Sequence, residues 1–156
     1  MMPEKRIMVK GLLSMLYAIL FFLFIQFLLG MYVNLYVVIP PMQGFSMMGF
    51  MPLYSGFPLV MAHMFFGILI GLLSIGIIIL SMETKVRRNI MAAAGLFFSV
   101  VLAGVNGLFF LFAGQHNLNS YLMSTGFILA ILFSILLLIY AGQGVRYSGK
   151  MNHHEL

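Results

Sequence analysis

Four long runs of apolar residues dominate the chain, and short segments that are polar or rich in proline separate them. A helix needs about 20 apolar residues to cross the ~30 Å hydrocarbon core of a bilayer. The runs that reach this length are Leu12–Val38, Pro58–Leu80, Asn89–Ala113 and Ser120–Ala141. The pattern predicts an all-α integral membrane protein in which residues 12–141 form a bundle of four transmembrane helices.

The composition of the 156 residues supports this class. Hydrophobic residues make up 63% and charged residues 7% of the chain, against about 45–50% and 25% in soluble domains. The net charge of +5 comes from only eight Lys and Arg side chains. These are too few to neutralise a track of phosphates, which excludes a nucleic-acid partner. The expected partners are the lipid bilayer and other membrane protein subunits.

The charged side chains are confined to three segments of the chain: residues 1–11, the loop between the second and third runs, and residues 142–156. Four spans place these segments on one side of the membrane, and the positive-inside rule assigns that side to the cytoplasm. We therefore expect a multi-pass protein of the cell membrane, with a cytoplasmic N-terminus (1–11) and a cytoplasmic tail (142–156).

Two further features are an apolar segment at the opposite, outer end and an internal similarity between the two halves of the chain. Residues 39–57 are too apolar for a solvated loop and too rich in Gly and Pro for a helix. Irregular backbone at membrane depth must be buried in protein or line a cavity, so we expect this segment to form an apolar lid. The sequences around Asn34 and Asn106, and around Gly67 and Gly126, are alike, which suggests a two-helix repeat.

Polar side chains inside the spans gather in the same outer half. Gln26, Gly30 and Asn34 share one line of the first helix, since residues four apart lie on one face. His63 and Asn106 lie on strips of small residues, which mark helix contacts in membranes. Together with Asn34, His116 and Met123, they predict a polar pocket at the outer end.

One interpretation of this pocket is a site for haem b, or for a quinone in a respiratory or haem-linked role. Haem iron takes axial histidines, and the cores of helix bundles hold such cofactors. His63 and His116 would ligate the iron, with Met123 as a substitute for the second histidine. Asn34 and Asn106 would complete the cofactor site.

A second interpretation is copper handling at the outer face. Four methionines of the lid, Met42, Met47, Met48 and Met51, cluster near His116 in the predicted topology. Thioether sulfur suits Cu(I), although Met is also a common filler of apolar packing.

A third interpretation is a non-enzymatic subunit or assembly factor of a membrane complex, or a membrane protein that binds a small ligand. No Asp or Glu lies in a span, and no glycine-rich phosphate motif is present, so the sequence favours no catalytic residue. In a subunit without a cofactor, His63, Asn34 and Asn106 would hydrogen-bond one another between helices, at roughly 0.6–2 kcal/mol each.

Four stretches carry a resemblance to an uncharacterised group of small four-helix prokaryotic membrane proteins: 30–36 (GMYVNLY), 62–63 (AH), 104–110 (GVNGLFF) and 119–123 (NSYLM). The overall plan also resembles one four-helix half of haem A synthase, and that resemblance implies a haem near the outer face. The chain differs from that family in having no acidic residue beside His63 and no cysteine pair in the outer loop.

Overall fold

A computed structural model of the protein describes residues 3–37, 56–112 and 116–151. These residues form four helices and no strand: α1 (Pro3–Tyr36), α3 (Phe57–Glu83), α4 (Arg87–Phe112) and α5 (Asn117–Met151). All four are long and apolar enough to cross a membrane, by length and composition. The prediction of an all-helical membrane protein with four transmembrane helices is thus confirmed at this level. The predicted lid, apart from Gly56 and Phe57, lies outside the described residues.

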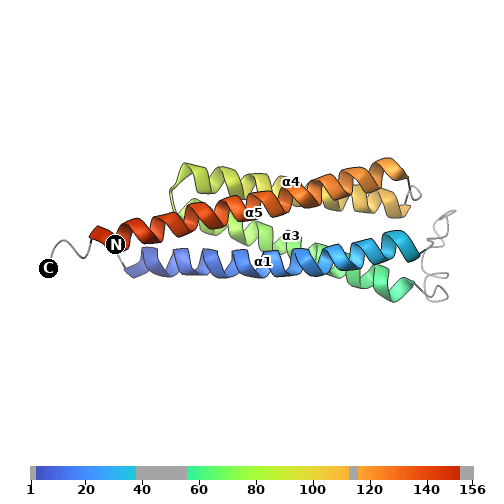
Figure 1. The fold of residues 1–156 in the computed structure, drawn as a ribbon, viewed down its shortest axis with the longest axis horizontal. Coiled ribbons are helices and arrows are strands. Elements are labelled where there is room, and N and C mark those ends of the chain that lie inside the picture. The colour runs from blue at the N-terminus through green and yellow to red at the C-terminus, as the bar shows by residue number, and fades with distance from the viewer. Residues whose placement is uncertain (1–2, 38–55, 113–115, 152–156) are drawn as a thin grey trace.

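The four helices pack as a ring. The helix pairs in substantial contact are α1 with α3, α3 with α4, α4 with α5, and α5 with α1. Each helix therefore contacts its two neighbours, and α1 and α4 lie diagonally opposite, as do α3 and α5. The start of α1 and the last turns of α5 lie at the same end of the elongated bundle (Figure 1).

The connection between α3 and α4 is a tight turn that Thr84 stabilises. Its hydroxyl donates a hydrogen bond to the carbonyl of Ser81 at 2.7 Å and accepts one from the side-chain amide of Asn89 at 3.3 Å. Lys85 takes the left-handed conformation with φ 55°, which completes the reversal. We call this end of the bundle the charged end, because Lys85 and Arg88 are exposed there. The opposite end, at which α1 ends and α5 begins, is called the uncharged end.

The buried residues follow stripes with alternating spacings of three and four. On α1 the buried members are Leu12, Leu16, Ile19, Leu23 and Val33, with Val37 just past its end, and on α3 they are Val60, Ile70, Ser74, Ile77 and Ser81. This spacing is the one that packs helices into near-parallel bundles. The stripes build a large apolar cluster toward the charged end and a small one of Val33, Val37, Val60 and Leu111 at the uncharged end.

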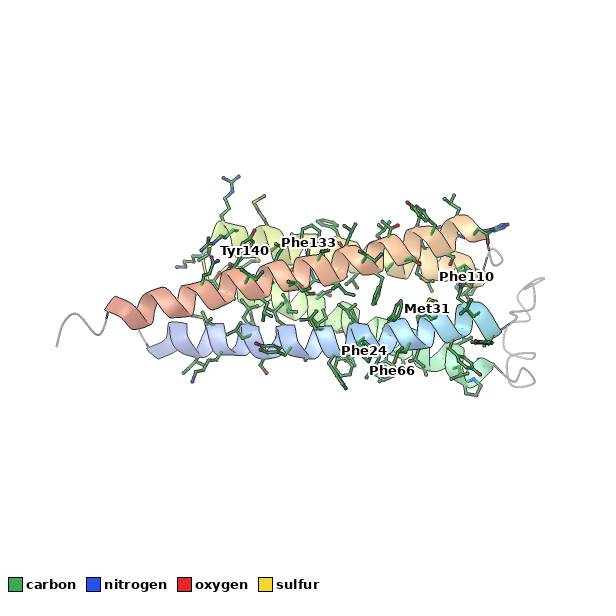
Figure 2. The ribbon with its side chains drawn as sticks, in the orientation of Figure 1. Phe24, Met31, Phe66, Phe110, Phe133 and Tyr140 are labelled. Carbon is green, nitrogen blue, oxygen red and sulfur yellow. The ribbon has the colours of Figure 1, made fainter. Side chains whose placement is uncertain are left out.

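The contact between α4 and α5 depends on small residues. A Cβ on Gly126 would lie 2.8 Å from both the amide nitrogen of Ala103 and the carbonyl oxygen of Ser99, so the two backbones approach closely here. Figure 2 shows Phe133 and Tyr140 on the side of α5 that faces α4; the Phe133 ring packs against Gly95 and the Tyr140 ring lies 5.4 Å below the Arg88 guanidinium. Close approach over small residues is the usual way in which membrane helices associate.

Large apolar side chains cover the outside of the bundle. The exposed ones include Phe21, Phe24, Phe65, Leu72, Phe98, Phe109, Ile128 and Leu132, each at least half exposed. A soluble protein would not leave so much contiguous apolar surface in water, whereas a bilayer solvates it. The exposed surface and the length of the helices therefore point to the same environment.

Candidate functional site

Both core stripes contain partly exposed positions at one level of the bundle. The stripe of α1 continues between Leu23 and Val33 through Gln26 and Gly30, and that of α3 continues between Val60 and Ile70 through His63 and Gly67. These four positions are partly exposed, whereas all the other members of the two stripes are at most 8% exposed. Gln26 and His63 thus lie at the more exposed positions of the two stripes, between the two apolar clusters.

Gln26 and His63 meet at this level. The amide nitrogen Nε2 of Gln26 lies 3.3 Å from the ring nitrogen Nε2 of His63, within hydrogen-bond distance. Each side chain packs over a glycine of the facing helix: His63 over Gly30, where a Cβ would lie 2.9 Å from its Cε1, and Gln26 over Gly67, at 3.4 Å. The two glycines therefore make room for the pair, and the sequence pattern Gln26–Gly30 on α1 is matched by His63–Gly67 on α3.

The pair leaves two polar atoms without partners. Among the described residues, neither Oε1 of Gln26 nor Nδ1 of His63 has a hydrogen-bond partner, and both atoms are buried. A buried polar group without a hydrogen bond is costly, and in a bilayer no surrounding water compensates for it. Such atoms call for a physical explanation, for example a water molecule or another bound group that satisfies them.

The three polar residues expected to form the pocket each have a different partner. Asn34 is exposed, and its Oδ1 accepts a hydrogen bond of 3.3 Å from the hydroxyl of Ser120, which links α1 to α5. Asn106 is buried, but its amide donates to the carbonyl of Leu102, one turn earlier in its own helix, at 2.8 Å. His63 is hydrogen-bonded to Gln26 rather than to either asparagine.

Gln26 is the residue that the sequence analysis did not select as a site residue. The sequence does place Gln26 on the polar face of α1, because Gln26 lies on the same line as Gly30 and Asn34. That line identifies a face of the helix and not the residue opposite, and only the packing of α1 on α3 brings Gln26 to His63.

The two histidines expected to ligate a haem lie at different levels of the bundle. His63 lies at the level of Gly30, and Asn34 lies at the level of Ser120. From Gly30 to Asn34 is one helical turn toward the uncharged end. From Ser120 to His116 is about one further turn in that direction. At a rise of 1.5 Å per residue, the backbones of His63 and His116 are separated by about 12 Å along the bundle axis. His116 is also exposed, immediately before the start of α5.

Met123, the expected substitute ligand, lies near the level of His63. Its sulfur is 3.5 Å from the Cβ position of Gly107, so the side chain packs against α4. It belongs to α5, which lies diagonally across the bundle from α3. The structure therefore places Met123 on the opposite wall of the polar level and in contact with α4 rather than with His63.

The other expected metal ligands lie elsewhere. Met42, Met47, Met48 and Met51 fall within 38–55, outside the described residues. The part of the chain that the structure describes holds no group of three or more His, Cys, Asp or Glu side chains suited to a metal ion.

No protein-family model, curated protein or solved structure matches the chain. The molecule is defined by its own fold and site: a four-helix bundle of membrane-spanning character with a Gln–His pair in its interior. Because a fold does not specify a function, the functional argument rests on the chemistry of this pair.

Proposed function

We propose that this protein is a non-enzymatic membrane protein that binds a small lipid-soluble molecule at the Gln26–His63 pair, in the quinone class. The observation that carries the proposal is the pair of buried, unpartnered atoms, Oε1 of Gln26 and Nδ1 of His63. They belong to side chains at the partly exposed positions of the two core stripes. A ligand that hydrogen-bonds to these atoms would remove the cost of leaving them unsatisfied.

The surroundings of the pair support a ligand with an apolar body. The apolar cluster around Leu23 and Ile70 lies on one side of it, and the cluster around Val33 and Val60 lies on the other. Ligand sites are mostly apolar and use a few polar groups to orient the ligand. A quinone combines a flat apolar ring with hydrogen-bonding oxygens and partitions into lipid, and so it suits this environment.

A second candidate function, a subunit or assembly factor without any ligand, is favoured by a different observation. The hydrogen bonds from Gln26 to His63 and from Ser120 to Asn34 both join neighbouring helices. Interhelical polar contacts of this kind hold membrane bundles together. In that case the Gln–His pair would be a structural contact, and its loss would change stability without changing any bound molecule.

A binding measurement distinguishes the two functions. The protein, purified in detergent and transferred to nanodiscs, is titrated with a short-chain quinone in its oxidised and reduced forms by calorimetry, and native lipid extracts of the purified protein are analysed by mass spectrometry. We expect binding by the wild-type protein and its loss in both Gln26→Met and His63→Leu. Asn106→Leu is the matched control, because Asn106 is buried at a similar level and, among the described residues, its amide bonds to its own helix.

Failure of the wild-type protein to bind either redox form would refute the proposal, and so would equal binding by all three variants. A lower melting temperature of His63→Leu with no bound molecule in the wild-type extract would support the structural alternative.

We further propose that the bundle lies in the cell membrane with both ends of the chain in the cytoplasm. Lys85, Arg87 and Arg88 occupy the charged end near the α3–α4 turn, and the positive-inside rule places such residues in the cytoplasm. A two-helix repeat also belongs to this proposal. Gly67 and Gly126 occupy similar positions in the two halves of the sequence. Gly67 of α3 packs against α1, and Gly126 of α5 packs against α4, so each glycine contacts the helix that precedes it in the chain.

A further inference from the structure

The number of donors and acceptors at the Gln26–His63 pair restricts the head group of the ligand, if the proposed function holds. A neutral imidazole carries one N–H donor and one acceptor nitrogen, and a glutamine amide carries one acceptor oxygen and one NH₂ group. One atom of each residue is engaged in the contact of 3.3 Å between them. One polar atom therefore remains without a partner on each side chain, Oε1 of Gln26 and Nδ1 of His63. The hydrogen-bonding role of one atom fixes the role of the other.

The amide as placed directs its NH₂ group to His63. Nε2 of His63 must then be the acceptor, so Nδ1 carries the proton and is an unpartnered donor, while Oε1 of Gln26 is an unpartnered acceptor. Turning the amide by 180° reverses every role: Oε1 accepts from Nε2–H, Nδ1 becomes an acceptor and the NH₂ group becomes the free donor. In both arrangements the neutral pair presents one unpartnered donor atom and one unpartnered acceptor atom; when the NH₂ group bonds to His63, its second N–H is a further donor.

We infer that the ligand is recognised through a hydroxyl group, and that the site prefers a quinol to the corresponding quinone. A hydroxyl donates one hydrogen bond and accepts another, which matches the pair in either orientation of the amide. A quinone carbonyl only accepts, and it would leave the acceptor of the pair unsatisfied. A water molecule would satisfy both atoms but keep one O–H without a partner, since buried waters make about three hydrogen bonds.

Two glycines lie next to the pair. Gly30 and Gly67 have no Cβ, and they lie beside the ring of His63 and the amide of Gln26. They are two of the partly exposed positions in the otherwise buried stripes. The two glycines therefore accommodate the side chains that would hold the ligand hydroxyl.

The test compares three ligands of one ring and chain length on the wild-type protein in nanodiscs under anaerobic conditions. These are the short-chain quinol, the quinone and the quinol methylated on both oxygens. We expect the quinol to bind about tenfold more tightly than the other two, since each lacks the hydroxyl hydrogen and one hydrogen bond. Because all three titrations use wild-type protein, a folding defect cannot imitate this result. In Gln26→Met, which is expected to lose binding, no preference among the three ligands should remain.

A fourth titration with decanol separates the sources of the hydroxyl. Binding of decanol at least as tight as that of the quinol, with the same loss in Gln26→Met, would support hydroxyl recognition and assign the site to a lipid alcohol. Equal or tighter binding of the quinone or of the methylated quinol would overturn the inference and leave the proposed quinone-class function standing. Binding of none of the four ligands would overturn both.

Discussion

The imidazole ring of His63 lies against the backbone of Gly30, so that a Cβ at position 30 would be 2.9 Å from Cε1 of the ring. Only glycine leaves this space, and the ring in turn reaches Gln26, one turn along α1. The α1–α3 contact and the polar pair therefore depend on the same glycine.

The first prediction concerns this contact. Gly30→Ala should displace the His63 ring and destabilise the bundle by about 1–3 kcal/mol, the usual cost of overpacking. Thermal unfolding in detergent, followed by circular dichroism, measures the effect. Gly104→Ala is the control, because a Cβ at this exposed helical position meets no atom within 4 Å. Equal melting temperatures for the two variants would contradict the close contact.

The second prediction concerns the α4–α5 contact. Gly126→Ala would place a Cβ 2.8 Å from backbone atoms of Ala103 and Ser99. Backbone atoms of a helix cannot rotate away as a side chain can, so this variant should lose at least as much stability as Gly30→Ala, about 2–3 kcal/mol. Gly71→Ala, with nothing within 4 Å, serves as the comparison in the same unfolding assay. A stable Gly126→Ala protein would show that the two helices are further apart than described here.

Sequence alone anticipated the difference between these glycines only in part. Gly126 and Gly67 lie on strips of small residues that mark helix contacts. Gly71 belongs to the same strip as Gly67 and yet faces open space. The spacing identifies a face of a helix, whereas the crossing of two helices decides which positions on that face are in contact.

The third prediction separates stability from function at the polar pair. Gln26→Met and His63→Leu alone should each be destabilising, because each removes the only partner described for the other buried side chain. The double variant should recover this loss, since replacing both members of a buried polar pair by apolar groups is often neutral or stabilising. A double-mutant cycle of unfolding free energies should give a coupling of about 0.6–1.7 kcal/mol.

The double variant should nevertheless bind no quinol. Recovery of stability together with loss of binding would show that the pair is retained for its ligand. A coupling near zero would instead show that the two side chains do not interact in the membrane.

The fourth prediction concerns the orientation of the bundle. The chain contains no cysteine, so single cysteines can be introduced without background. Leu118→Cys, exposed at the uncharged end, should react with a membrane-impermeant maleimide in intact cells. Val86→Cys, exposed at the charged end, should react only after the cells are opened. The reverse pattern would place the charged end outside and contradict the positive-inside assignment.

The sequence by itself determined the class of protein and the approximate positions of its helices. The length of the apolar runs and the confinement of charge to three segments require a membrane protein of four helices, and the structure contains four helices of this kind. These properties follow from composition and from interactions along one helix, which are local.

The partners of the polar side chains were decided only by the tertiary structure. Asn106 bonds to its own helix, Asn34 to Ser120, and His63 to Gln26. An asparagine in a helix can satisfy its amide on the preceding turn or on a neighbouring helix, and the sequence is the same in both cases. The rotation and axial register of each helix against its neighbours settle the choice. They are determined by side chains from all four helices packing at once, which places Gln26 opposite His63.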